Sequence, residues 1–135
     1  MSRLTLSRFI WATLVEEARR SLPNECCGLL GGRGHEVLQV YPATNELASP
    51  VAYEVPPREL LALFRRLRAQ NLELVGLYHS HPTGDNAPSA RDRARAYYPD
   101  VAYVIVSPRQ DVPRPVRAFL LQAGEVRELS AEVVD

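Results

Sequence analysis

An apolar run, Leu72–Tyr78, constrains the fold of this chain more than any other segment, and Glu73 is its only charged member. A run of this length fits a strand with both faces buried, and such strands lie in the middle of a sheet that other layers cover. Residues 79–88, which follow, are dense in turn formers and predict a loop. We therefore expect a central strand that ends at a polar loop.

Three segments predict helices. The first covers about residues 8–22 with Ser7 as its N-cap, the second follows Pro56-Pro57 to about residue 70, and a short third runs from Ser89 to about residue 98. In the first two, apolar side chains recur with the helical period. The first helix has an apolar stripe of Ile10, Trp11, Leu14, Val15, Ala18 and Leu22 and a polar face of Glu16, Glu17, Arg19 and Arg20; the stripe of the second is Leu60, Leu61, Phe64 and Leu67.

Short apolar runs between turn residues predict the other strands. Two of them flank Gly32-Arg33-Gly34 and indicate a β-hairpin. The expected ranges are 26–32 and 36–41 for the hairpin, a brief strand at 51–55 within a loop over 42–55, and strands at 101–106, 116–122 and 125–129. This order predicts an α/β fold: a single domain over residues 1–135, with a mixed β-sheet wrapped by about three helices.

The charge balance argues against partners that are bound through a basic surface. The 16 basic and 16 acidic residues give a formal net charge of zero, and the sequence pI is about 6.8. We therefore expect no nucleic acid and no membrane among the partners. All basic residues are arginine. A chain without lysine offers no side-chain amine for isopeptide formation, but a coding bias explains this composition more simply.

The cysteines and the N-terminal segment indicate the cytoplasm. Cys26 and Cys27 are adjacent, so in an extended segment they point to opposite faces and do not form an ordinary disulfide. They could in principle bind zinc, but their place in an apolar strand favours packing. Residues 1–11 lack an apolar signal core, and no apolar run approaches the ~20 residues that span a bilayer.

The loop after the central strand carries the residues of a candidate metal site. His79 and His81 are two apart at a strand end, so their imidazoles leave the same face. Ser89 and Asp92, three apart, share one face of the helix that follows. Two imidazoles and one carboxylate form the ligand set of a catalytic zinc site, whose fourth position stays open for water.

Each part of this pattern also has a simpler explanation. Ser89 and Asp92 form a Ser-x-x-Asp capping box, which explains both without a metal. A His-x-His pair at a strand end is weak evidence when taken alone. The third histidine, His35, follows the hairpin turn and is expected to be a solvated hairpin residue. The joint pattern favours the metal because the other two histidines lie together beside a loop of Gly, Pro and Asn.

The arrangement His79-x-His81-Pro82 followed by Ser89-x-x-Asp92 resembles the JAMM motif of the MPN-domain (Mov34/PAD-1-like) metalloproteases. A second pattern of this family, Pro-x-Glu-x-Cys-Gly-Leu-Leu-x-Gly, is present at residues 23–32. The resemblance continues through residues 75–78, 101–107 and the closing hairpin, so it covers most of the chain. It implies an MPN/JAB1 fold, similar to that of cytidine deaminases.

The resemblance also implies residue roles. His79, His81 and Asp92 would bind one Zn²⁺ per chain, Glu25 would act as general base on the zinc-bound water, and Ser89 would donate to the oxyanion. Without the family, Glu25 would pass for a surface residue.

The compact chain is similar to the small prokaryotic branch of the family. Such members hydrolyse the amide bond after the C-terminal Gly-Gly of a ubiquitin-like sulfur-carrier protein, and they either trim an extension or release an attached amino acid such as cysteine. The alternatives are a deubiquitinase-like isopeptidase and a non-catalytic MPN-type binding module. A zinc deaminase is excluded because it needs a His-x-Glu and a Pro-Cys-x-x-Cys ligand pair. A homodimer is left open.

Overall fold

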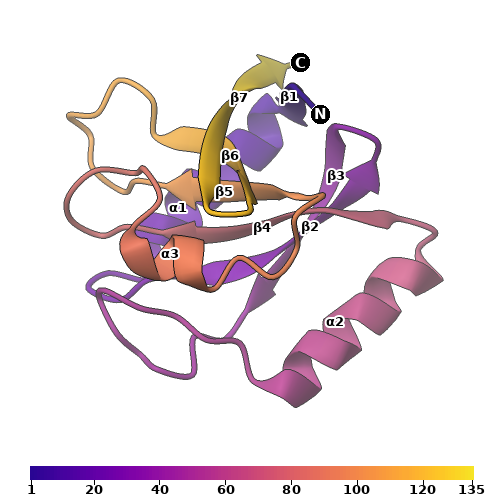
Figure 1. Ribbon diagram of the computed structural model, residues 1–135, viewed down its shortest axis with the longest axis horizontal. Helices are drawn as coiled ribbons and strands as arrows, with labels where there is room; N and C mark the ends of the chain where they lie inside the picture. Colours follow the sequence, from indigo (N-terminus) through magenta and orange to yellow (C-terminus); the bar gives the residue numbers. More distant parts are fainter.

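The apolar run lies in strand β4 (Glu73–Ser80), which is placed between β2 and β5 at the centre of the sheet (Figure 1). It runs antiparallel to β2 and parallel to β5, so the sheet is mixed, as predicted. The strand order β1-β3-β2-β4-β5-β6-β7 closes into a barrel, because β1 pairs with both β7 and β3. The other strands are β1 (Arg3–Ser7), β2 (Cys27–Arg33), β3 (Glu36–Ala43), β5 (Ala102–Val106), β6 (Val116–Gln122) and β7 (Glu125–Val134). This computed structural model describes all 135 residues.

Helix α1 (Arg8–Arg20) covers one face of the curved sheet and forms the main core with it. Ser7 caps it as predicted, and the Ser7 Oγ accepts a hydrogen bond from the Ile10 N–H. The predicted stripe packs against the sheet except for Leu22, which lies beyond the helix and is 48% exposed. The prediction of a solvated Glu17 was wrong: it is buried and accepts a 2.6 Å hydrogen bond from the Tyr78 hydroxyl.

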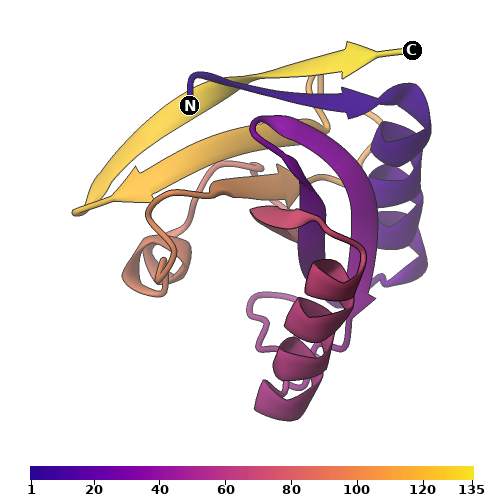
Figure 2. The same cartoon turned by 90° about the vertical axis from the view of Figure 1, so that its right-hand side faces the viewer.

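The opposite face carries α2 (Pro57–Ala69) and the short α3 (Ala90–Ala94). Figure 2 shows α1 and α2 on separate sides of the strands. Leu63 and Leu67 of α2 are buried, whereas Leu61, predicted in the stripe, is 52% exposed. Tyr78 of β4 points to the α1 side and Leu77 to the other. Because side chains alternate along a strand, His79 faces the side of α3. None of the three helices has the length and apolar character needed to cross a membrane.

Five parts of the predicted element pattern were wrong. Strand β1 was not predicted, and β7 continues to Val134 because it pairs with β1 along five residues, Arg3–Ser7. Strand β4 continues through His79 and Ser80, which the sequence assigned to a loop. The brief strand at 51–55 is absent, and α3 ends at Ala94 rather than near residue 98.

Candidate metal centre

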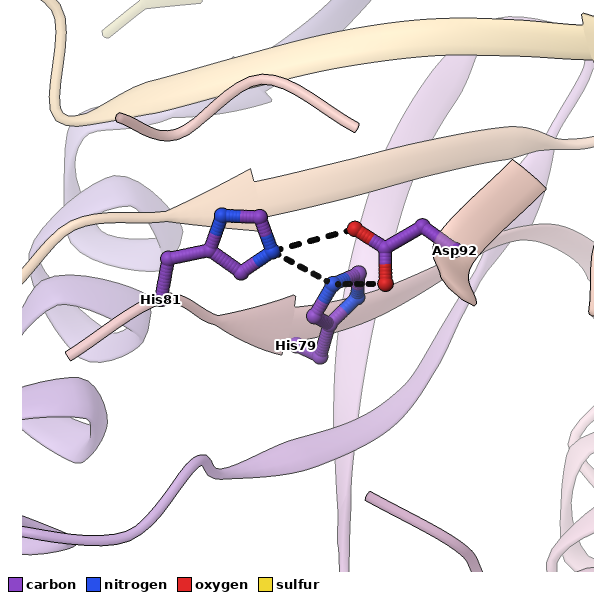
Figure 3. A group of neighbouring side chains, drawn as sticks. All are labelled: His79, His81 and Asp92. Carbon is purple, nitrogen blue, oxygen red and sulfur yellow. Dashed lines mark hydrogen bonds and ion pairs between the residues drawn. The ribbon is translucent and has the colours of Figure 1, made fainter. Parts of the chain in front are cut away.

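His79, His81 and Asp92 converge where β4 ends beside α3 (Figure 3). His79 is the second-last residue of β4, and His81 directly follows the strand. Because they are two residues apart, both imidazoles leave the same face. Asp92 reaches them from α3. One potential ligand atom from each residue lies within 4.8 Å of the other two, so the structure brings together the three predicted ligands.

The spacing of these atoms fits a small tetrahedral cation. The Nε2 atoms of His79 and His81 are 3.2 Å apart. Asp92 Oδ1 lies 3.1 Å from the Nε2 of His79, and Asp92 Oδ2 lies 3.0 Å from the Nε2 of His81. Ligand atoms at zinc-ligand distances of 2.0–2.1 Å are separated by about 3.3 Å in a tetrahedron. The donor set and its spacing therefore fit a zinc ion with one position left open.

Asp92 caps α3 and faces the two imidazoles at once. Its Oδ2 accepts a 2.9 Å hydrogen bond from the backbone N–H of Ser89, and its own N–H donates to Ser89 Oγ at 3.1 Å. This is a complete capping box, in which each of the two side chains accepts a hydrogen bond from the backbone N–H of the other residue. The capping explanation of the Ser-x-x-Asp pattern is thus confirmed, and it is compatible with a metal site because the cap fixes the carboxylate that points at the imidazoles.

The electrostatics favour the metal-binding forms of His79 and Asp92, whereas for His81 burial is outweighed by the hydrogen bonds to Asp92 and to the Asp85 carbonyl, which raise the pKa. Burial lowers the pKa of His79, which favours its neutral imidazole. Burial alone would raise the pKa of Asp92, but the hydrogen bonds from His79 and His81 outweigh it and hold the pKa well below its usual range. A neutral imidazole and an ionised carboxylate are the metal-binding forms of these groups.

His81 is held through its second ring nitrogen. Its Nδ1 lies 2.7 Å from the carbonyl oxygen of Asp85, so Nδ1 donates and Nε2 is directed at the site. Two side chains fix the loop that carries this carbonyl. Arg117 contacts the Asp85 carboxylate at 3.3 Å, and the buried Asn86 donates to the backbone carbonyl of Arg114 at 2.8 Å.

Glu25 lies close to the proposed ligands, two residues before the start of the neighbouring strand β2. Cys27 of β2 is opposite His79 of β4, and the Ser80 N–H donates to the Cys26 carbonyl at 3.0 Å. Continuing this antiparallel register by two residues beyond the last strand pair would place Glu25 opposite His81, and the Glu25 carboxyl group is close enough to His81 and Asp92 for their charges to affect its pKa. Its carboxylate is buried, has no hydrogen-bond partner within the protein, and has a pKa that burial raises to about 7.

The other sequence-based assignments at the site also have clear outcomes. Cys26 and Cys27 are free and buried, and they lie on opposite faces: Cys26 packs in the α1 core, and the Cys27 thiol points at the Ala43 carbonyl. Neither belongs to the ligand group, and nor does His35. The Ser89 side chain accepts its capping bond at the exposed edge of the site, which leaves its hydroxyl hydrogen free to donate.

Three neighbours of the site were not found from the sequence. The Tyr53 ring stacks on the His79 ring with centroids 4.6 Å apart. Arg91 lines, together with Tyr53, His79 and Asp92, a cavity of about 180 Å³ beside the ligands. Asn45 makes hydrogen bonds with Ala52 and Glu54, on either side of Tyr53. No local pattern marks any of these residues, because each acts through a contact that forms only in the folded chain.

Three relatives match most of the chain. The desampylase of Haloferax volcanii is 36% identical over 98% of this chain and 97% of its own length. The CysO-cysteine peptidase of Mycobacterium tuberculosis is 34% identical over 90% and 85%. The probable TtuB-protein conjugate cleaving protease of Thermus thermophilus is 41% identical over 83% and 74%. The family described as prokaryotic homologs of the JAB domain matches residues 8–122.

Solved structures share the fold along the whole chain. A protein from Desulfitobacterium hafniense is 34% identical, with a TM-score of 0.85 over 98% of this chain and 93% of that one. A JAB1/MPN-domain protein from Archaeoglobus fulgidus has a TM-score of 0.67 at 18% identity, over 99% and 100% of the two chains. A structure described as a JAMM metalloprotease-like zinc site in the proteasome and signalosome has a TM-score of 0.64 at 19% identity, over 98% of both chains.

Proposed function

This chain belongs to the family of prokaryotic homologs of the JAB domain, and we propose that it is a zinc metallopeptidase acting on a ubiquitin-like sulfur-carrier protein. Its reaction is hydrolysis of the amide bond after the carrier's C-terminal Gly-Gly. The enzyme class, a JAMM-type hydrolase, is that of relatives that match almost the full chain. The observation that carries the proposal is the triangle of His79, His81 and Asp92 with the unpartnered Glu25 carboxylate close to it.

His79, His81 and Asp92 would hold one zinc ion per chain. When bound, zinc supplies a Lewis acid that brings the pKa of water to near neutrality and offsets negative charge on the reacting carbonyl. The identity of the metal is supported by the nitrogen and oxygen donors, their spacing and the fold shared with a metalloprotease-like zinc site.

Glu25 is the proposed general base. In the metal-free protein, burial raises the pKa of this carboxyl group to about 7, and burial therefore favours its uptake of a proton. Glu25 therefore takes a proton from the attacking water and later gives one to the leaving nitrogen. Its oxygens are free for both transfers because no other side chain binds them.

Ser89 is proposed to stabilise the transition state. Its Oγ is fixed by the capping bond from the Asp92 N–H, so the hydroxyl hydrogen can point away from the helix toward the site. A donor fixed in advance stabilises the oxyanion of the tetrahedral intermediate without reorganisation at the moment of reaction. No covalent intermediate is needed for this chemistry.

The substrate class follows from the relatives and from the size of the cavity. The named relatives act on protein conjugates or on a carrier-cysteine adduct: a desampylase, a TtuB-conjugate protease and a CysO-cysteine peptidase. The cavity beside the ligands has a volume of about 180 Å³ and suits a narrow extended segment. Glycine, without a Cβ, lets a backbone approach closely in such a space.

The test is to incubate the zinc-loaded protein with sulfur carriers bearing C-terminal extensions and to measure the product masses. We expect a carrier that ends in Gly-Gly, loss of cleavage on chelation, and recovery on addition of zinc. Little action on Lys-linked polyubiquitin is expected. Efficient polyubiquitin cleavage without action on any extended carrier would instead support the deubiquitinase-like alternative, and full activity of the metal-free protein would refute the metal assignment.

A further inference from the structure

Arg91 is a half-buried cation without an anionic partner. Of the 16 arginines in the chain, only Arg91 and Arg117 are half-buried, and all others are exposed. Arg117 makes two hydrogen bonds with the Glu128 carboxylate and one with Asp85. The Arg91 guanidinium makes no hydrogen bond or ion pair with any residue of the protein. A half-buried guanidinium that lines a cavity and has no partner within the protein is available to bind an anionic ligand there.

The surroundings of Arg91 show where this anion binds. Arg91 directly precedes Asp92 and lines the cavity that also contacts His79. Tyr53, Tyr98 and Tyr103 supply much of the remaining wall as aromatic surface, and the charged residues Glu54 and Arg95 also line the cavity. The positive charge of Arg91 is also among the influences that lower the pKa of Glu25 against the larger effect of burial. The guanidinium is therefore close to the proposed base and to the ligands at once.

We propose that Arg91 binds the free α-carboxylate of a single amino acid attached to the terminal glycine of the carrier. This inference rests on the proposed function and names its preferred substrate: a carrier extended by one residue. Hydrolysis breaks the glycine C–N bond, transfers the water oxygen to the glycine carboxyl group, and releases the amino acid with its amine protonated. Arg91 is then a specificity-determining residue and takes no part in proton transfer.

The geometry of the substrate explains the preference for one residue. The carboxylate of a single added residue lies only two bonds from the scissile nitrogen, so its receptor must lie next to the ligands. Each further residue can carry the terminal carboxylate up to about 3.3–3.6 Å farther away. A lysine isopeptide places Nζ at the scissile bond and has no carboxylate at this distance. Guanidinium is suited to this task because it binds a carboxylate through two parallel hydrogen bonds.

The experiment compares two forms of one probe in the zinc-loaded, full-length protein. The probe is the carrier cleaved in the preceding experiment, extended by one alanine that ends either in a carboxylate or in a carboxamide. The wild-type protein should have a kcat/KM at least about tenfold higher for the carboxylate form, the scale of a hydrogen bond to a charged group. Arg91→Ala should bring this ratio close to one, and Arg91→Lys should leave an intermediate ratio because it keeps only a point charge.

Two control variants separate the subsite from general electrostatics. Arg93→Ala removes an exposed charge from the same helix and should keep the wild-type ratio. Arg95→Ala removes the second, exposed arginine of the cavity, and its ratio should change less than that of Arg91→Ala. A purely electrostatic effect of Arg91 on Glu25 would alter cleavage of both probes equally and would cancel in the ratio.

A binding measurement keeps the inference distinct from the proposed function. Glu25→Gln should bind the extended carriers but turn them over slowly, so their affinity can be measured by calorimetry. The carboxylate form should bind more tightly to the Glu25→Gln variant than to the double variant that also carries Arg91→Ala. Equal affinity and equal cleavage of the two probes by wild-type Arg91 would overturn the inference while leaving the peptidase function intact. Selective binding without turnover in the wild-type protein would support the subsite and refute the proposed reaction.

Discussion

At the scale of single residues, Glu25 is a buried residue whose carboxyl group makes no hydrogen bond within the protein. If its role is proton transfer alone, Glu25→Gln should keep the zinc content near wild type because all three proposed protein ligands remain. General-base assistance is typically worth ~10²–10⁴-fold, and we expect at least this loss in kcat. Metal analysis and steady-state kinetics of the purified variant test both parts. An empty metal site would make Glu25 a ligand, and unchanged turnover would require another base.

The same carboxyl group should make the metal-free protein pH-sensitive. The pKa of Glu25 rises from 4.5 to about 7 on folding, so the folded state holds its proton more tightly than the unfolded state. Stability from the neutral acid is fully present below about pH 4.5 and is lost as the pH rises through about 7. Glu25→Gln has no such loss, so it should be more stable than wild type by about 1 kcal/mol or more at pH 8.

Denaturant unfolding in the presence of a chelator, at pH 5 and pH 8, measures this difference. The advantage of the glutamine variant should shrink toward pH 5. An advantage that grows as the pH falls would show that a favourable interaction, rather than burial, controls the titration of this residue.

Ser89 should separate capping from catalysis. Ser89→Ala loses the cap, at a cost of about 1 kcal/mol in unfolding free energy, and the proposed oxyanion donor, at about 10²-fold in kcat. Zinc should remain bound, since Ser89 is not a proposed ligand. Ser89→Thr keeps the hydroxyl group and should recover most of both losses. If Ser89→Ala lost stability but kept kcat, Ser89 would be a capping residue only.

Sequence patterns predicted those residues of the site that local structure holds at a fixed spacing along the chain. His79, His81 and Asp92 were recognisable because a strand end and a helix start impose their spacing on the sequence. Glu25 was recognisable only through the family pattern, because strand pairing brings it to the site from far away in the chain. Arg91 was beyond such reasoning: its meaning depends on the absence of a partner, which only the folded arrangement shows.

At the scale of elements, the segment between β3 and α2 shows how a loop can be fixed without a strand. The side chain of Asn45 donates to the carbonyls of Glu25 and Ala52, and its Oδ1 accepts from the N–H groups of Leu47 and Glu54. These bonds join the two limbs of the loop to the residue proposed as base. They also fix the position of Tyr53, whose ring covers His79.

Asn45 should therefore influence turnover from outside the ligand set. Asn45→Ala should lower the unfolding free energy by about 1–3 kcal/mol, because backbone groups in the loop lose their partners. It should also reduce kcat as the loop loosens around Glu25 and Tyr53. Asn45→Asp retains the acceptor for the Leu47 and Glu54 N–H groups but loses the bonds donated to the Glu25 and Ala52 carbonyls. It therefore distinguishes the effect of the donated bonds from that of the accepted ones. Steady-state kinetics and chemical unfolding of both variants measure these effects. A kcat equal to that of the wild type in both variants would contradict an influence of Asn45 on turnover.

The elements that were predicted well are those whose signal is local. The helical periods of α1 and α2 and the hairpin turn gave correct element types, and Gly34 has the positive φ of 61° that the turn requires. Two of the errors fall where contacts in the folded chain, rather than local sequence patterns, decide the structure. The short β1 exists because it pairs with β7 at the other end of the chain, and the Val-rich segment at 51–55 is not a strand because side-chain bonds from Asn45 hold it instead.

At the scale of the whole molecule, the site joins parts of the chain that the sheet alone does not connect. Strand β4, between β2 and β5 in the barrel, supplies His79, the loop after it supplies His81, and α3 supplies Asp92. Helix α3 has five residues and no fully buried side chain, so little packing holds it in place. A metal bound by all three residues would attach this helix to the central strand.

Zinc should therefore stabilise the folded protein as a whole. A ligand that binds only the folded state at 100 times its Kd adds about 2.7 kcal/mol, which corresponds to roughly 10 °C in Tm for a domain of this size. Thermal unfolding with and without saturating zinc measures the shift. His79→Ala and Asp92→Ala should lose it, and Asp92→Ala should also lose up to ~1 kcal/mol without zinc because the capping box is broken. His35→Ala, which removes the one histidine outside the ligand group, should keep the full shift. An unchanged wild-type Tm at saturating zinc would show that α3 and β4 are held together without the metal, whereas a shift that persists in His79→Ala would place the stabilising ion elsewhere in the molecule.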